Sequence, residues 1–196
     1  MSELFQQIPG LEAVVEREAA VRNQSFLDDL PEVICGIEVK PLTLRMVLLL
    51  ECIGSPFIGG GIVQPHDIGA FLIVVAGNPK GFRRWRLLRR VGKMNANHAV
   101  VEIESYVSES FMDRPGSSGS SGASYYSNAA AFVDLFASEY GWSTERVLNA
   151  PLKQLFQCLK ATAKRHNPKA ILFNKLSGKV ICRHLEKVTA ENQSRN

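Results

Sequence analysis

The sequence predicts an all-α fold, a compact multi-helix bundle with at most a small β element near residues 33–39. Apolar residues recur at the spacing of an amphipathic helix in several segments of the 196-residue chain. Most of these segments are bounded by proline, glycine or a capping hydroxyl, which are common helix start and stop signals. Hydrophobic residues make up 45% of the chain and charged residues 21%, values typical of a globular protein with a packed core.

The N-terminal region, residues 1–112, is expected to be helical around one short β element. Residues 11–22 predict a first helix, and the β-branched run at 33–39 predicts a short strand or the start of a two-stranded ribbon. Thr43 is the expected N-cap of an apolar helix that ends near Ile53, where Gly-Ser-Pro follows.

Two more helices are expected in this region. Residues 68–76 form an apolar segment with Pro65 suited to its first turn and Gly77 just past its end. A longer helix is expected to begin near Pro79. Its C-terminal extent stays open, because the alternation of residues 99–107 also fits a strand.

The longer helix carries a basic segment, residues 82–93. At about 100° per residue, its apolar and basic side chains separate onto two sides, and we expect the apolar side to be buried. The apolar side chains are those of Phe82, Trp85, Leu88 and Val91. The basic side chains, which form a candidate interaction face, are those of Arg83, Arg86, Arg90 and Lys93.

Residues 113–124, rich in glycine and serine, predict a flexible linker ahead of a C-terminal helical region, residues 125–196. In that region Ser143 is an expected N-cap, and a helix after Pro151 has apolar residues at i, i+3, i+4 and i+7. That stripe consists of Leu152, Leu155, Phe156 and Leu159, while Lys153, Gln154, Gln157 and Lys160 are expected to face away. A final helix is predicted over residues 178–190.

Catalytic patterns are missing, and we expect no enzyme, cofactor or metal site. The Gly59–Gly61 run lacks the lysine and hydroxyl of a phosphate loop, and no histidine has an obvious carboxylate partner in the sequence. The one metal-like group of residues, Cys158, His166, Cys182 and His184, lacks paired ligand spacing. The scattered cysteines favour a reducing compartment, and we expect neither a signal peptide nor a membrane span.

The net charge is +4 and is unevenly distributed. Residues 1–79 hold four basic and ten acidic side chains, whereas residues 80–93 hold seven basic ones and no acid. Arginines beside a tryptophan are the ingredients of phosphate contact and base stacking, so DNA or RNA binding through helix 82–93 is an alternative function. Burial of Phe82 and Trp85 would weigh against that alternative.

Two stretches resemble small helical proteins of tailed bacteriophages and prophages, of the tail assembly chaperone type. The first is Lys-Pro-Leu-Thr-Leu-Arg at 40–45, followed by an apolar helix and Ile-Gly-Ser-Pro-Phe at 53–57. The second is Tyr-Gly-Trp-Ser at 140–143, followed by Val-Leu at 147–148 and Pro-Leu at 151–152. The second stretch continues to Leu155–Phe156, and the resemblance as a whole extends over about half of the chain.

The resemblance implies a non-catalytic protein that binds a tape measure or tail tube protein in the bacterial cytoplasm. Phe57, Ile58, Ile62 and Trp142 are candidate protein-interaction residues, with packing inside the protein as the competing interpretation for each. A structural virion component of the neck or tail, which would be located in the virion, is the alternative within phage biology.

Overall fold

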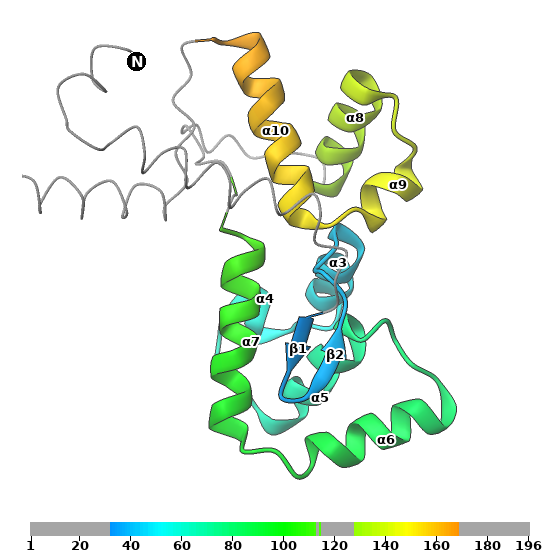
Figure 1. The fold of residues 1–196 in the computed structure, drawn as a ribbon, viewed down its shortest axis with the longest axis vertical. Helices are drawn as coiled ribbons and strands as arrows, with labels where there is room; N and C mark the ends of the chain where they lie inside the picture. The colour runs from blue at the N-terminus through cyan, green and yellow to red at the C-terminus, as the bar shows by residue number, and fades with distance from the viewer. Residues whose placement is uncertain (1–31, 113, 115–127, 169–196) are drawn as a thin grey trace, which may run out of the picture.

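A computed structural model of the protein describes residues 32–112, 114 and 128–168. Over these residues the fold is all-α with one small two-stranded sheet, as the sequence predicts. The elements in chain order are β1 (Glu32–Ile34), β2 (Ile37–Val39), α3 (Leu44–Cys52), α4 (Pro56–Gly59), α5 (Pro65–Val75), α6 (Gly81–Val91), α7 (Ala96–Ser110), α8 (Asn128–Tyr140), α9 (Thr144–Asn149) and α10 (Leu152–His166). Helices α8, α9 and α10 gather at one end of the molecule, and β1, β2, α5, α6 and α7 occupy the other (Figure 1).

The small β element is a hairpin. Its antiparallel strands pair Ile34 with Ile37, so the connecting turn holds Cys35 and Gly36, whose φ angles are +50° and +73°. Two consecutive positive φ angles match the twist of a tight hairpin turn. Ile34, Ile37 and Val39 are buried, which fixes one face of the hairpin on the protein.

The two apolar helices of the N-terminal region form as expected. The Thr43 hydroxyl caps α3 by accepting a hydrogen bond from the Met46 N–H. In α5, Pro65 occupies the first turn, and the Asp67 carboxylate accepts from the Gln64 N–H at 2.7 Å. Both helices are central to the core: Leu50, Phe71, Leu72 and Val75 are completely buried.

The segment that also fitted a strand is helical. Helix α6 ends at Val91, and the Asn95 side chain then caps α7 by accepting from the N–H groups of Asn97 and His98. Helix α7 buries Ile103 and Tyr106 on the side that faces the core. The amphipathic pattern of residues 82–93 and the alternating pattern of residues 99–107 therefore belong to two separate helices, α6 and α7.

The C-terminal elements follow their predicted caps. The Ser143 hydroxyl accepts from the Arg146 N–H at the start of α9, and α10 follows Pro151 with Leu155 and Phe156 buried. The expectation that Lys160 faces away from the core is wrong, because only 8% of it is exposed. Lys160 lies one helical turn after Phe156 on the same face, where its aliphatic stem can cover apolar surface.

The two halves of the described chain meet at the start of α3. The Leu152 N–H donates to the Leu42 carbonyl at 2.8 Å, and Thr43 forms an isolated β-bridge with Pro151. The Arg45 guanidinium reaches the Glu145 carboxylate at 2.7 Å. Buried apolar residues from both halves form one cluster.

The helices predicted at 11–22 and 178–190, and nearly all of the linker predicted at 113–124, lie outside the described residues. The division into regions 1–112 and 125–196 stays a prediction. Among the residues that the structure describes, no helix is both long and apolar enough to span a membrane.

Candidate interaction surface

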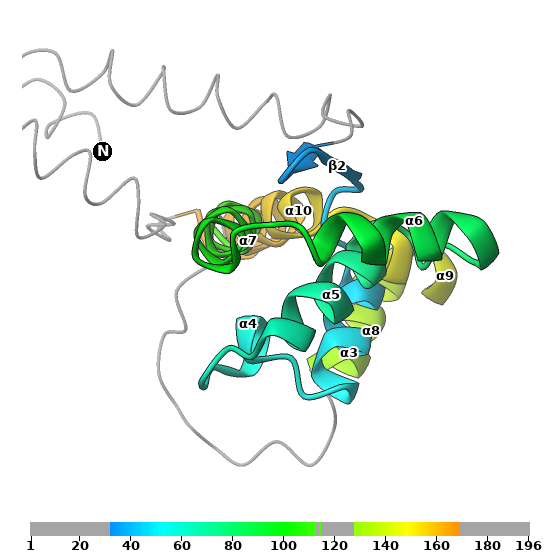
Figure 2. The ribbon, with the colours of Figure 1, turned by 90° about the horizontal axis from the view of Figure 1, so that it is seen from below.

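Helix α6 is attached to the rest of the protein along a narrow line. Leu87 is its one buried residue, and Val91, one turn later, is half-buried. Across this line lies Gly69 of α5, where an added Cβ would sit 3.7 Å from the Leu88 side chain and 3.8 Å from that of Val91. In both views α6 lies at the edge of the molecule and extends outward from α5 (Figures 1 and 2).

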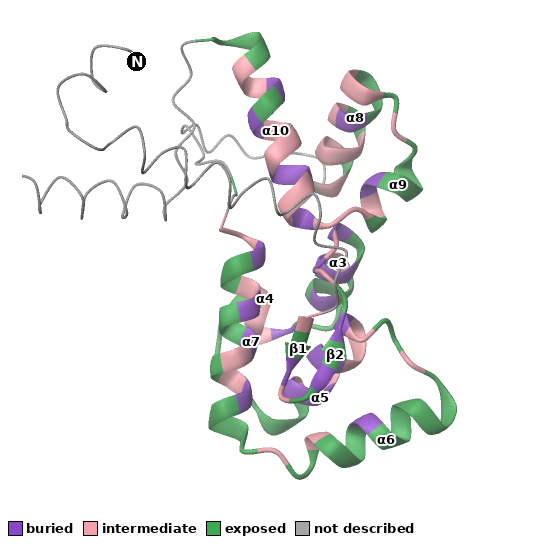
Figure 3. Ribbon diagram, in the orientation of Figure 1, coloured by how far each residue is buried: buried purple, intermediate pink, exposed green. Residues whose placement is uncertain are grey.

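Of the four apolar side chains of α6 that the sequence places in the core, three are exposed and Val91 is half-buried. Phe82 is 71% exposed, Trp85 52% and Leu88 43%, so this expectation is wrong. Leu87 is the buried residue of α6, and at about 100° per residue Phe82 lies about 140° away from it around the helix. Figure 3 shows α6 exposed over nearly its whole length.

The exposed aromatic residues form a platform with an arginine. The rings of Phe82 and Trp85 stack with centroids 5.5 Å apart and an interplanar angle of 25°. The Arg89 guanidinium lies 5.4 Å from the Trp85 ring centroid, within the range of a cation–π contact. We call Phe82, Trp85 and Arg89 the α6 platform.

The predicted basic face borders this platform. Arg83, Arg86, Arg90 and Lys93 are all exposed. Three of them, the arginines, line a hollow of about 300 Å³ together with Ile37, Glu38 and Leu87. Arg90 also donates a hydrogen bond to the Gly36 carbonyl at 2.6 Å, which ties α6 to the β-hairpin. Within the described part of the chain, no carboxylate pairs with Arg83 or Arg86, so both remain available to a partner.

The other predicted interaction residues lie in different surroundings. Phe57 and Ile58 are half-buried on α4, and the Phe57 ring packs edge-on against Phe71 with centroids 5.1 Å apart. Ile62, in the loop that follows, is 85% exposed. Of these three residues, only Ile62 offers most of its surface to a partner.

Trp142 anchors a turn and is half-buried. Its ring stacks on Phe136 with centroids 5.2 Å apart, and the Arg146 guanidinium covers it at 4.2 Å. A hollow of about 470 Å³ beside it is lined by Ser143, Glu145, Arg146 and Asn149 among others. This hollow lies at α9, far from α6 along the molecule (Figure 1), so the candidate residues do not form one continuous patch.

Three histidines have carboxylate neighbours, contrary to the sequence expectation. His98 lies 3.2 Å from Glu102, His166 lies 2.8 Å from Glu139, and His66 lies 3.4 Å from Asp67. The first pair is spaced i, i+4 on α7 and was visible in the sequence. The second joins α10 to α8 and depends on how these helices pack.

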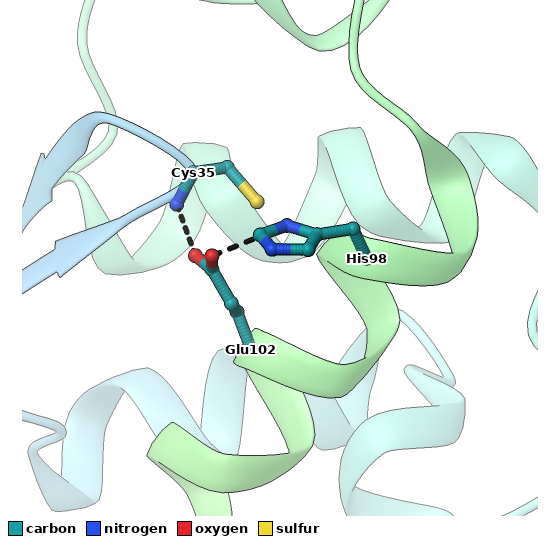
Figure 4. Close-up of side chains that lie close together, drawn as sticks. All are labelled: Cys35, His98 and Glu102. Atoms are coloured by element: carbon teal, nitrogen blue, oxygen red, sulfur yellow. Dashed lines mark hydrogen bonds and ion pairs between the residues drawn. The ribbon is translucent and has the colours of Figure 1, made fainter.

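Two of the four residues in the metal-like group fall in the described chain. Cys158 and His166 both lie on α10, and burial raises the pKa of the Cys158 thiol. Cys182 and His184 lie outside the described residues. A different cluster, missed by the sequence analysis, brings Cys35 close to His98 and Glu102 (Figure 4).

Comparisons with protein-family models, with curated proteins and with solved structures gave no match. Function is therefore inferred from the surface and its chemistry. The fold and surface define a mostly helical protein with an exposed aromatic and basic helix.

Proposed function

We propose that this protein is a non-catalytic phage or prophage assembly protein, of the tail assembly chaperone type, that binds a tape measure or tail tube protein. The observation that carries the proposal is the exposed face of α6. Tryptophan and arginine are enriched in binding hot spots and phenylalanine is enriched in interfaces, and here all three lie together in solvent on one helix. A binding protein needs such a surface, and it needs no active site.

The resemblance to tail assembly chaperones gains support from packing. Its two stretches lie about 100 residues apart in sequence, yet they contact each other through the Leu42–Leu152 hydrogen bond and the Arg45–Glu145 ion pair. Residues that match one family pattern are expected to meet in space when they build one structural unit. This unit comprises α3, α9 and α10, and α6 lies outside it, where it can face a partner.

The charge of α6 indicates the partner's chemistry. Seven basic residues and no acid occur between Lys80 and Lys93, so the matching surface is acidic with apolar side chains between the acids. An amphipathic acidic helix satisfies both requirements, because its apolar stripe can cover Phe82 and Trp85 while its carboxylates meet Arg83 and Arg86.

The test is co-expression with the tail proteins encoded by neighbouring genes, followed by nuclease treatment, affinity capture and mass spectrometry. We expect a long helical tail protein to be recovered. Trp85→Ala should weaken its binding about 30-fold, as expected for a hot spot worth about 2 kcal/mol. The double variant Arg83→Glu/Arg86→Glu should abolish recovery at physiological salt.

Matched controls come from exposed residues elsewhere on the described chain. Val101→Ala removes an apolar side chain that is 65% exposed on α7, and Arg114→Glu reverses an exposed charge outside α6. Both should leave recovery unchanged. Equal losses in the α6 variants and the controls would contradict the proposed surface.

Nucleic-acid binding is the second candidate function, and the exposure of Trp85 favours it. Stacked exposed aromatics, and arginines such as Arg83 and Arg86 that pair with no carboxylate of the described residues, suit single-stranded DNA or RNA. Under this alternative, affinity for an oligonucleotide falls steeply with salt, and log Kd follows log salt concentration. Recovery of nucleic acid alone, lost at high salt, would replace the chaperone proposal.

A structural role in the virion is distinguished by purification of particles. A chaperone leaves before the particle is complete, whereas a neck or tail component stays in it. Detection of the chain at stoichiometric amounts in purified particles would support the structural alternative.

A further inference from the structure

Three potential metal ligands from two elements meet at the edge of the β-hairpin. Cys35 is in the hairpin turn, while His98 and Glu102 are one turn apart at the start of α7. One ligand atom from each residue lies within 4.8 Å of the other two. Figure 4 shows the sulfur and the carboxylate both directed toward the imidazole ring.

We propose that Cys35, His98 and Glu102 form a binding site for Zn²⁺. A thiolate, an imidazole and a carboxylate are the three ligand types that zinc accepts in proteins. In tetrahedral coordination, bond lengths of about 2.0–2.3 Å place ligand atoms about 3.5 Å apart. The His98 Nδ1 to Glu102 Oε1 distance is already 3.2 Å, so small side-chain rotations would complete the arrangement.

The Glu102 carboxylate is held in a suitable orientation. Its Oε2 accepts a hydrogen bond from the Cys35 backbone N–H, which leaves Oε1 directed toward His98. A metal ion at Oε1 would keep the Oε2 hydrogen bond as an outer contact that orients the ligand. The Arg90 hydrogen bond to the Gly36 carbonyl fixes the other side of the same turn.

The residue type at position 35 is unusual for its backbone. Cys35 has a φ of +50° in the first position of a two-residue hairpin turn, where asparagine, aspartate or glycine is preferred. A cysteine is strained there, and strained residues cluster at functional sites. The strained turn projects the thiol over α7, next to His98.

The charges balance when zinc is bound. Zinc displaces the thiol proton, so one thiolate and one carboxylate would neutralise the divalent cation. Without metal the thiol stays protonated, because burial and then the Glu102 carboxylate raise the pKa of Cys35 to about 11. With three protein ligands, the fourth position is open to water or to a partner's side chain.

Cobalt substitution of the full-length protein tests the site. We expect one Co²⁺ per chain, with a sulfur-to-cobalt charge-transfer absorption that Zn²⁺ removes by displacement. Cys35→Asn should eliminate this absorption, and His98→Ala should weaken Co²⁺ binding at least about 10-fold. Asparagine tolerates positive φ, so Cys35→Asn should keep the metal-free fold, as judged by circular dichroism.

Matched variants elsewhere separate this site from adventitious binding. Cys52→Ser and His66→Ala remove an exposed cysteine and an exposed histidine, and both should retain the absorption. His98 is 68% exposed, so His98→Ala carries the test if Cys35→Asn does not fold. The proposal is overturned if the unaltered protein gives no charge-transfer absorption, if Cys35→Asn retains it, or if His98→Ala binds Co²⁺ normally.

Discussion

Tyr106 joins α7 to the end of the β-hairpin through one hydrogen bond. Its hydroxyl donates to the Lys40 carbonyl at 2.6 Å, and its ring meets Phe71 edge-on with centroids 6.1 Å apart. The side chain is almost completely buried, and this burial raises the pKa of the Tyr106 hydroxyl. The phenol therefore remains a hydrogen-bond donor well into the alkaline range.

Tyr106→Phe is expected to lower the free energy of unfolding by about 1 kcal/mol, because it removes this partly buried hydrogen bond to the Lys40 carbonyl. Tyr106→Ala should cost about 3–5 kcal/mol, since the ring is also lost. Urea denaturation measures both values. Equal costs for the two variants would show that the hydroxyl carries all of the effect and the ring none.

Glu139 links stability to pH. The hydrogen bond from His166, followed by the charge of Arg165, lowers the pKa of Glu139 in the folded protein. A carboxyl group whose pKa is lower in the folded state than in the unfolded state stabilises the fold at pH values above its unfolded-state pKa of about 4.3. The contribution is lost as the pH falls through the lower, folded pKa.

Glu139→Gln should therefore reduce the stability difference between pH 6 and pH 3, compared with the unaltered protein. Thermal unfolding across this range measures the difference. Asp134→Asn, which removes an exposed carboxylate on the same helix, is the control. A wild-type pH profile in Glu139→Gln would contradict the assignment.

A contact between two residues could be predicted when the residues are close together in the sequence. The Thr43 and Ser143 caps were predicted because a capping hydroxyl and its partner N–H lie three residues apart. The approach of Cys35 to His98 was not, because it depends on the hairpin packing against α7. Only the i, i+4 spacing of His98 and Glu102 could have drawn attention to that cluster.

At the scale of elements, the sequence predicts α3, α5 and α10 well and α6 poorly. The wide apolar stripe of α10 allows only one orientation of this helix against the core. The burial of Lys160 is the feature of α10 that this pattern does not predict. In α6 the apolar residues spread around half of the helix. Leu87, outside the predicted stripe, is its buried residue, whereas Leu88 and Val91 from the stripe lie over Gly69 of α5. Periodicity alone cannot tell which part of so broad an arc meets a neighbour, because that depends on α5.

Neighbouring leucines on α6 should respond differently to truncation. Leu87→Ala is expected to cost about 2 kcal/mol, since Leu87 is 9% exposed and holds α6 to the protein. Leu88→Ala should cost clearly less, because Leu88 is 43% exposed. Trp85→Ala should change stability by no more than about 0.5 kcal/mol. Chemical denaturation of the three variants ranks them, and a large loss for Trp85→Ala would place that ring in the core.

At the scale of the whole molecule, the two halves are coupled through α3. The Leu42–Leu152 hydrogen bond and the Arg45–Glu145 ion pair cross between them, and Val47, Val147 and Leu155 belong to one buried cluster. The exposed ion pair contributes little by itself. The shared apolar cluster is the stronger coupling, because its burial is lost if either half separates.

This coupling predicts one cooperative unfolding transition for both halves. In a Trp85→Phe background, fluorescence reports on Trp142 in the C-terminal half, whereas far-ultraviolet circular dichroism reports on all helices. Ile103→Val, a mild change in the completely buried part of α7, should lower stability by about 0.5–1.5 kcal/mol. The urea midpoint at Trp142 should then move as far as the midpoint of the circular dichroism signal, because a two-state protein loses both halves together. A fixed Trp142 midpoint would mean that regions 1–112 and 125–196 unfold independently, and the interface at α3 would then be a docking contact between two domains.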